Sequence, residues 1–205
     1  MAKKRIAVLS MSSGNPRLML AGVDDGQVSI VKCEELPRSM LTLKLKLPRK
    51  LKNFRDKGFI VLVDEVVPYF SKYGRSVSMD DKTDNGLPLV VAAMQAYTNL
   101  KALQAITFPK NDGGRYEISP SLVEQIRGAD GKIAYNIAWD ELRPDTYALL
   151  LAIYAATQDS LLDTATLKDV FSLLGNKNQP EKSVNNRMNA VMEARTNLIY
   201  GGNDE

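Results

Sequence analysis

Apolar residues in the first third of the chain follow patterns that are typical of β-strands. Arg5–Ser10 and Arg17–Val23 are short apolar segments, and Gln27–Cys33 alternates between polar and apolar residues. Leu41–Leu47 alternates strictly, with leucines on one side and polar residues on the other, which predicts a half-buried strand. Phe59–Val63 is a continuous apolar run rich in β-branched residues, so we expect a strand that is buried on both faces.

Helical spacing of apolar residues dominates the second half of the chain. Pro88–Leu103 and Leu142–Thr157 are expected to be helices, and the stretch Tyr147–Ala156 contains no charge, so the second helix must be buried against a sheet. A buried strand covered by helices predicts an α/β fold. The shorter elements expected are a surface loop at 74–86, a strand at 105–108 and a short helix at 119–124.

The C-terminal part of the chain changes character after residue 158. It is polar and helical in pattern, and Ser183–Tyr200 is expected to be an amphipathic helix. We therefore expect one domain over residues 1–158 and a small C-terminal helical extension over residues 159–205. The apolar side of the last helix either packs on its own domain or binds a protein partner.

Composition removes several classes of chemistry. The chain has no histidine and a single cysteine, Cys33, which excludes Ser-His-Asp and Cys-His nucleophiles as well as metal sites built from histidine or several cysteines. We expect Cys33 to be a small core residue. No apolar run approaches the roughly twenty residues of a membrane helix, and the apolar run after the basic N-terminus is too short for a secretory signal. A cytoplasmic location without membrane contact is expected.

Acidic residues gather at three places where an apolar segment meets its boundary. They are Asp24-Asp25, Asp64-Glu65, and Asp140-Glu141 with Asp145. Clustered carboxylates suit hard cations such as Mg²⁺ or Mn²⁺, which support phosphoryl chemistry without histidine. Each cluster also has a structural interpretation. Asp24-Asp25-Gly26 suits the turn of a hairpin running from Leu18 to Val31, Asp64-Glu65 can end a strand in solvent, and Asp140 or Asp145 can stabilise a helix N-terminus.

Basic residues are concentrated in the stretch from Arg38 to Arg55, which contains no acid. The net charge of +3 and the pI near 8.9 are mild, so only such local concentration would attract phosphates. The stretch is either a solvated surface or a surface that contacts nucleic-acid phosphates. The candidate DNA-contacting residues are Lys44, Lys46, Arg49, Lys50, Lys52 and Arg55, together with Lys72 and Arg75.

The order of these elements resembles the ribonuclease H-like superfamily, specifically RuvC-type resolvases and the nuclease domain of phage terminase large subunits. Gly22-Val23-Asp24-Asp25-Gly26 is similar to the family's Gly-Ile-Asp-x-Gly strand, and Ile60–Glu65 to its apolar strand ending in an acid. Asp140–Leu149 resembles the family's acidic helix start, although the last acids are spaced one residue further apart and Thr146 stands where the family has alanine. The resemblance covers about residues 17–157.

The resemblance implies a ribonuclease H-like mixed sheet flanked by helices and a two-metal carboxylate site that hydrolyses DNA phosphodiester bonds with Mg²⁺ or Mn²⁺. It implies no ATPase motor, because no Gly-x-x-x-x-Gly-Lys-Ser/Thr loop occurs. Asp64 and Glu65 compete for one ligand position. The catalytic and metal-binding residues implied are Asp24, Asp64 or Glu65, Asp140 and Asp145.

A second hypothesis belongs to a different class of protein. The chain would be a non-catalytic structural or interaction protein of phage type that binds a protein or nucleic acid. The two hypotheses differ in geometry, because an enzyme needs its acidic clusters within reach of one metal centre.

Overall fold

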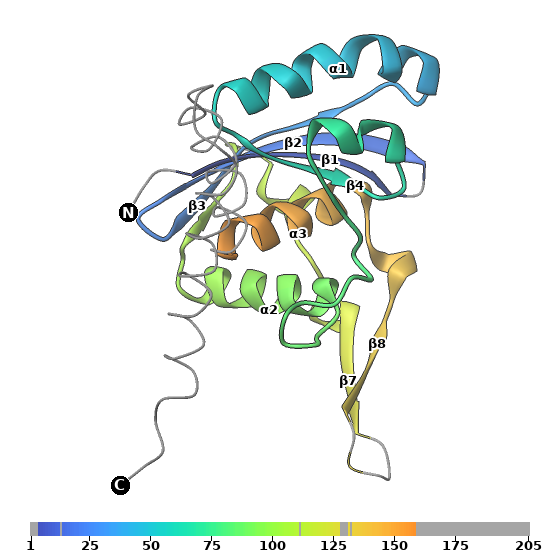
Figure 1. Cartoon of the computed structure of the whole chain (residues 1–205). Coiled ribbons are helices and arrows are strands. Elements are labelled where there is room, and N and C mark those ends of the chain that lie inside the picture. Colours follow the sequence, from blue (N-terminus) through green and yellow to red (C-terminus); the bar gives the residue numbers. More distant parts are fainter. Residues whose placement is uncertain (1–3, 13, 111, 128–130, 132, 159–205) are drawn as a thin grey trace, which may run out of the picture. The chain divides into compact units, whose positions relative to one another are not determined.

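A computed structural model describes residues 4–158, apart from residues 13, 111, 128–130 and 132. The described residues form a six-stranded mixed sheet in the order β5-β4-β1-β2-β3-β6, with helix α1 on one face and helices α2 and α3 on the other (Figure 1). The predicted fold class, α/β with a mixed sheet flanked by helices, is confirmed. The strands are β1 (Lys4–Ser12), β2 (Asn15–Asp24), β3 (Gln27–Glu35), β4 (Ile60–Asp64), β5 (Arg75–Val77) and β6 (Ile106–Thr107).

The first three strands form an antiparallel meander, which contains the hairpin predicted from Leu18 to Val31. β2 and β3 are joined by a tight turn in which Asp25 and Gly26 have φ angles of 48° and 77°. Two successive residues with positive φ are what a two-residue hairpin turn requires. The structural interpretation of Asp24-Asp25-Gly26 as a hairpin turn is therefore correct.

Strand β4 lies parallel to β1, and β5 lies parallel to β4. The residues from Val61 to Asp64 are buried, which confirms the expectation of a strand covered on both faces. Because β1 and β4 are parallel, their carboxyl ends meet at the same edge of the sheet. The candidate site lies at that edge.

The segment 41–47 is helical, and its prediction as a strand is wrong. It begins helix α1 (Met40–Asp56), whose N-terminus is capped by the Ser39 hydroxyl, which accepts a hydrogen bond from the N–H of Thr42. The buried residues Leu43, Leu47 and Leu51 recur every four positions, and this helical ridge extends beyond the window that alternates. Proline at position 48, inside the helix, also disguises it, since proline disfavours helix interiors.

The other face of the sheet is covered by α3 (Pro144–Thr157), and α2 (Leu89–Ala102) packs against α3; both helices lie close to the predicted ones. The uncharged stretch of α3 is buried against β1 and β2, as expected. Pro120–Leu122 forms only a short 3₁₀ helix, η3, so the helix predicted at 119–124 is largely wrong, and strand β7 begins at Val123. The remaining elements are 3₁₀ helices η1 (Pro68–Tyr73), η2 (Gly113–Tyr116) and η4 (Trp139–Glu141), and strands β7 (Val123–Arg127) and β8 (Ile133–Ile137).

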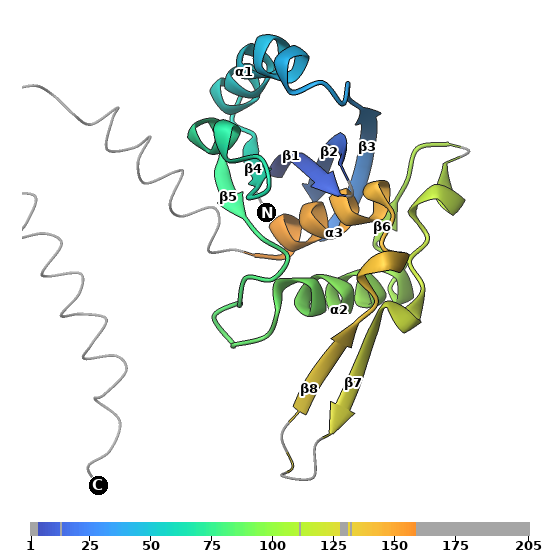
Figure 2. The ribbon, with the colours of Figure 1, turned by 90° about the vertical axis from the view of Figure 1, so that its right-hand side faces the viewer.

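Strands β7 and β8 pair as an antiparallel ribbon that extends away from the six-stranded sheet (Figure 2). The loop expected at 74–86 contains the short strand β5, and the strand expected at 105–108 is β6. The predicted extension 159–205, with the helix Ser183–Tyr200, lies outside the described residues. Within the described part of the chain, every helix is too short or too polar to cross a bilayer.

Candidate functional site: a carboxylate corner and a cationic face

Asp64 and Asp145 lie at the edge of the sheet where β1 and β4 end and β2 begins. Asp64 is the last residue of β4, and Asp145 lies in the first turn of α3, against Arg17 of β2. We call these two acids, with Arg17 and Arg115, the carboxylate corner. Strand β1 lies between β4 and β2, so the backbones that carry Asp64 and Arg17 are about 10 Å apart.

Asp64 is only 1% exposed, so its carboxylate is buried, and it accepts hydrogen bonds from two backbone N–H groups. Oδ2 accepts a hydrogen bond from the N–H of Met11 at 3.0 Å, and Oδ1 accepts one from the N–H of Val66 at 3.2 Å. Burial raises the pKa of Asp64 above its ordinary value, although these two donors and the Tyr147 hydroxyl oppose the shift. The Asp64 carboxylate therefore fixes the end of β4 against the end of β1.

The Asp145 carboxylate is held by two guanidinium groups. Arg17 Nε donates to Oδ1 at 2.8 Å, while Arg115 donates from Nε to Oδ2 at 2.8 Å and from Nη2 to Oδ1 at 2.9 Å. The two bonds from Arg115 form a fork, the geometry in which guanidinium–carboxylate pairs are strongest. Burial acts to raise the pKa of Asp145, but the hydrogen bonds from Arg115 and Arg17 outweigh burial, and the net pKa lies below its ordinary value.

The single thiol also touches this carboxylate. Cys33 Sγ lies 3.4 Å from Asp145 Oδ1. Burial, followed by the negative charge of Asp145, raises the pKa of the Cys33 thiol to about 12. Because the thiolate is the reactive form, Cys33 is held unreactive, consistent with the small packing residue that the sequence suggested.

Asp24 does not join the carboxylate corner, contrary to the expected convergence of the three clusters. Its neighbour Val23 pairs with Lys4 at the start of β1, whereas Val63 pairs with Leu9, five residues further along the same strand. That separation is roughly 17 Å along the sheet. The motif Gly22–Gly26 therefore lies at the end of the second strand of the fold, away from the carboxylate corner.

Ser10 occupies the position on the first strand that lies beside Asp64. The register Leu9↔Val63 brings Ser10 next to Asp64 at the ends of the two parallel strands. Ser10 is fully buried, and its hydroxyl has no hydrogen-bond partner among the described residues. The side chain beside Asp64 on the neighbouring strand is therefore a hydroxyl, which adds no carboxylate to the corner.

The remaining predicted acids lie outside the corner. Glu65 is exposed and follows β4, and Asp140 is exposed in η4. Glu141, also in η4, accepts a hydrogen bond from the Ser121 hydroxyl at 3.2 Å. Among the residues that the structure describes, no three histidine, cysteine, aspartate or glutamate side chains are grouped as a metal ion would require.

Sequence reasoning missed the two arginines that define the corner. Arg17 is 8% exposed, and its position in an otherwise apolar segment was the one signal available, because a charge within such a segment needs a partner. Arg115 gave no comparable signal, since it lies in a polar stretch before η3. Both partners are far from Asp145 in sequence, at separations of 128 and 30 residues.

The basic residues predicted to contact DNA lie mainly on the exposed side of α1. Lys44, Lys46, Arg49, Lys52 and Arg55 are exposed, and no acid occurs in the helix before Asp56. We call these five residues, with Lys72 of η1, the cationic face. Lys50 is partly neutralised, because its Nζ lies 2.9 Å from Glu34 Oε2, and Arg75 is exposed on β5.

Tyr69 connects the two elements of the cationic face. The Nζ atoms of Lys44 and Lys72 each lie 4.8 Å from the centre of the Tyr69 ring, and Lys72 Nζ also lies 5.2 Å from the Tyr73 ring. Such cation–π contacts hold ammonium groups in place without cancelling their charge. The structure therefore orders two lysines beside an aromatic ring that is 39% exposed.

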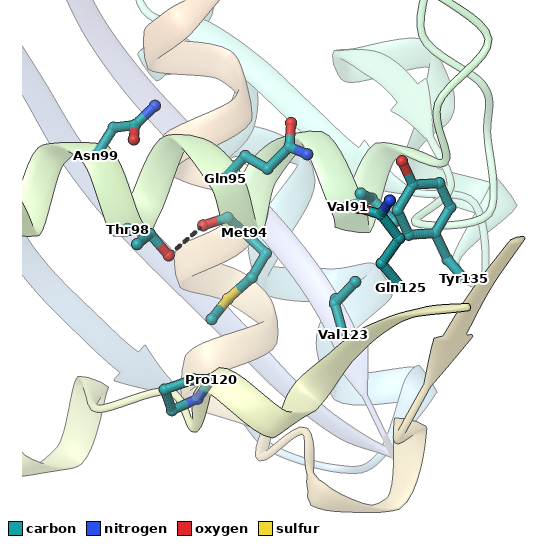
Figure 3. A pocket seen from close by; sticks show the side chains of 9 residues that line it. All are labelled: Val91, Met94, Gln95, Thr98, Asn99, Pro120, Val123, Gln125 and Tyr135. Atoms are coloured by element: carbon teal, nitrogen blue, oxygen red, sulfur yellow. Dashed lines mark hydrogen bonds between the residues drawn. The ribbon is translucent and has the colours of Figure 1, made fainter. Parts of the chain in front are cut away.

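A groove of about 450 Å³ lies between α2 and the β7–β8 ribbon (Figure 3). Its α2 side includes Met94 and Gln95, and Val123 and Tyr135 come from the ribbon. None of its lining residues carries a formal charge. The groove therefore lacks the acids and bases that catalysis needs, and it lies apart from the carboxylate corner.

No family model matches the chain, and no curated protein matches its sequence. Among solved structures, it is similar to the large terminase nuclease from thermophilic phage G20c, at 13% identity over 77% of this chain and 82% of that one, with a TM-score of 0.46. It is also similar to the large terminase nuclease domain of Thermus phage P74-26, at 12% identity over 75% and 78%, with a TM-score of 0.45. The g2p (large terminase) nuclease domain of bacteriophage SPP1 with bound Mn matches at 10% identity over 76% and 86%, with a TM-score of 0.39.

At these identities the likeness concerns the fold alone. The strand order β5-β4-β1-β2-β3, with β2 antiparallel to its neighbours, makes a mixed sheet, as the resemblance implied. The predicted resemblance to phage terminase nuclease domains is confirmed at this level.

The residues present do not fit the two-ion centre that the resemblance implied. A two-metal site holds its ions about 4 Å apart between several carboxylates. In the corner, Asp145 is occupied by guanidinium groups, Asp64 accepts backbone N–H donors, and Ser10 lies beside Asp64 in place of a third acid. No catalytic step through Mg²⁺ or Mn²⁺ is derived from this donor set.

Proposed function

We propose that this protein binds nucleic acid through the cationic face, on a ribonuclease H-like scaffold, by contacts to the phosphate backbone. The observation that carries the proposal is the exposed side of α1, which presents five cations and no acid before Asp56. Phosphate contacts of this kind position a protein on nucleic acid and give little base specificity.

The cationic face is held by a rigid frame. Leu43, Leu47 and Leu51 anchor α1 in the apolar cluster on this side of the sheet, so the exposed cations project from a fixed helix. Each cation that neutralises a phosphate releases counterions, and this release drives association at low salt. Tyr69 adds order to Lys44 and Lys72, which reduces the conformational entropy that these side chains give up on binding.

The experiment compares two triple variants of equal net charge by fluorescence anisotropy with a short labelled DNA duplex. Lys46→Gln, Arg49→Gln and Lys52→Gln together remove charge from the cationic face. Affinity at low salt should fall at least tenfold, and the slope of log K against log[salt] should become shallower by about 2.7, because each phosphate that is no longer neutralised changes the slope by about 0.9.

The matched control carries Lys82→Gln, Lys110→Gln and Arg127→Gln, which are exposed positions away from α1. It should bind DNA with nearly the affinity and salt slope of the wild-type chain. Equal losses in the two variants would show that overall charge, and not the cationic face, attracts DNA.

A second candidate function is metal-dependent cleavage of the bound nucleic acid, the narrower form of the nuclease hypothesis. The observation that favours it is the location of Asp64 and Asp145 at one edge of the sheet, on the side that α3 covers. Structures with bound Mn or magnesium among the similar terminase nucleases make the same divalent ions the ones to test. The donor set described above argues against this function.

A plasmid-nicking assay with Mg²⁺, Mn²⁺ and chelator separates the two candidates. We expect DNA binding without metal-dependent nicking. Nicking that requires metal and is abolished by Asp64→Asn, but not by Asp24→Asn at the end of β2, would establish the protein as a nuclease. Binding of a protein partner through the last predicted helix stays a prediction, because that helix lies outside the described residues.

A further inference from the structure

We infer that Arg17 and Arg115 take the place of divalent ions at the carboxylate corner, forming a permanent centre that joins β2, η2 and α3 and needs no metal. This inference is independent of the proposed nucleic-acid binding, because it concerns the opposite face of the sheet. It assigns a structural role to the position where ribonuclease H-like nucleases were expected to hold their ions.

The carboxylate oxygens of the corner already have donors. Both oxygens of Asp145 accept charged N–H donors at 2.8–2.9 Å, and both oxygens of Asp64 accept backbone N–H donors. A cation entering the corner would compete with these donors for the carboxylate oxygens. Loss of Asp145 would leave the largely buried Arg17 with the exposed Glu35 carboxylate, 3.4 Å from Nη2, and a buried charge that loses a partner costs more than an exposed one.

The formal charges of the corner are already largely offset. Arg17 and Arg115 both contact Asp145, and Arg17 Nη2 also lies 3.4 Å from the exposed Glu35 carboxylate, so two guanidinium groups stand against the three acids Asp64, Asp145 and Glu35. Two divalent ions would add four positive charges to a region with a formal charge of −1. Sites for hard cations instead collect an excess of carboxylate oxygens.

The third position of the corner is a hydroxyl. Ser10 reaches the edge beside Asp64 on the neighbouring strand, and its side chain is buried. A serine hydroxyl carries no charge, so it adds no attraction for a cation. The guanidinium groups are thus the only cations that the described residues bring to Asp145.

The test measures melting temperature by differential scanning fluorimetry, in chelator, in Mg²⁺ and in Mn²⁺. The wild-type chain should melt at the same temperature in all three. Asp145→Asn should lower the melting temperature by on the order of 5–10 °C, because it removes the charged acceptor of Arg115 and leaves the largely buried Arg17 with the exposed Glu35 carboxylate. The matched control, Asp140→Asn on the exposed turn η4, should melt like the wild-type chain.

Arg115→Gln keeps the inference testable if Asp145→Asn does not fold, because the Arg115 side chain is 35% exposed and tolerates replacement better. It should lower the melting temperature by a smaller amount, with no recovery on adding Mn²⁺. A wild-type melting temperature that rises with Mg²⁺ or Mn²⁺, and no longer rises in Asp145→Asn, would overturn the inference. So would wild-type melting of both Asp145→Asn and Arg115→Gln. Either result leaves the DNA affinity of the cationic face unaffected, so the two proposals fail separately.

Discussion

On the α1 face of the sheet, cationic side chains lie in solvent, whereas on the α3 face two arginines lie against one carboxylate. Arg49 is exposed on its helix, while Arg17, on a strand, is 8% exposed and bonded to Asp145. The same residue type is therefore open to solvent in one region and serves the fold in the other. The difference teaches that a positive charge is available for binding only where the fold brings no acid within reach.

The largest expected effect concerns the frame of the cationic face. Leu47 lies on the buried side of α1, whereas Leu45, two residues earlier in the same helix, is 75% exposed. Leu47→Ala should lower the free energy of unfolding by about 2–5 kcal/mol, and Leu45→Ala should change it by at most about 0.5 kcal/mol. Urea denaturation followed by circular dichroism measures both. Equal losses of unfolding free energy in the two variants would indicate that residues 41–47 form a strand, as their alternation suggested. They would contradict helix α1 as the frame of the cationic face.

The next effect is the pH dependence of stability on the α3 face. Asp145 has a folded pKa below its ordinary value of 3.8, so its contribution is present above that pH and is lost as the pH falls through the folded pKa. Asp145→Asn should therefore lower the free energy of unfolding near neutral pH by about 1–3 kcal/mol and flatten the acid-side loss of stability. Urea denaturation across the acid range measures it.

The pH dependence of stability that Asp64 contributes has the opposite sign to that of Asp145. Its folded pKa is raised, so its charged form weakens the fold, and stability is lost as the pH rises from the ordinary value through the folded one. A curve for Asp145→Asn that keeps the full acid-side loss would show that its ion pairs contribute no pH-dependent stability.

A smaller effect compares two neighbours on α1. Arg49 is exposed, whereas Lys50 lies against Glu34. Arg49→Gln should make the salt slope of DNA binding shallower by about 0.9, while Lys50→Gln should change it by less, because Glu34 already balances that charge. Anisotropy titrations over a series of salt concentrations decide this. A larger change in the salt slope for Lys50→Gln than for Arg49→Gln would contradict the expectation that a cation paired with an acid contributes less to DNA binding.

The smallest expected effect is at Tyr69. Tyr69→Leu removes the ring that orders Lys44 and Lys72 and should weaken DNA binding by about 0.5–1 kcal/mol. Tyr135→Leu, on the β7–β8 ribbon, is the matched control and should bind DNA like the wild-type chain. The same anisotropy assay applies, and equal losses at both tyrosines would contradict a specific role for the ring.

Sequence patterns predicted the fold where one pattern ran for the whole length of an element. The uncharged stretch of α3 and the apolar run of β4 have one interpretation each, and both are confirmed. The start of α1 has two interpretations. Its leucines recur every two residues from 41 to 47, as in a strand, and every four residues from 43 to 51, as in a helix. Only the longer window distinguishes a helix from a strand there.

The candidate site was predictable only in part, for a physical reason. Asp64 and Asp145 were identified because acids at a strand end and a helix start converge in many folds. Asp24 was misplaced because a hairpin turn and a metal-binding motif share the same residue types. The partner of Asp145 on β2, Arg17, is 128 residues away in sequence, and only the sheet register brings the two together.

Helix α1 joins β3 to β4, and these two strands run in the same direction because the meander reverses twice between β1 and β3. A connection between strands of equal direction must cross over the sheet, so the chain cannot reach β4 without this segment. The proposed binding surface is therefore carried by an obligatory crossover, and a polyanion that binds it would stabilise the folded domain. Heparin or DNA should protect the whole domain against heat, which makes thermal protection a label-free report of ligand capture.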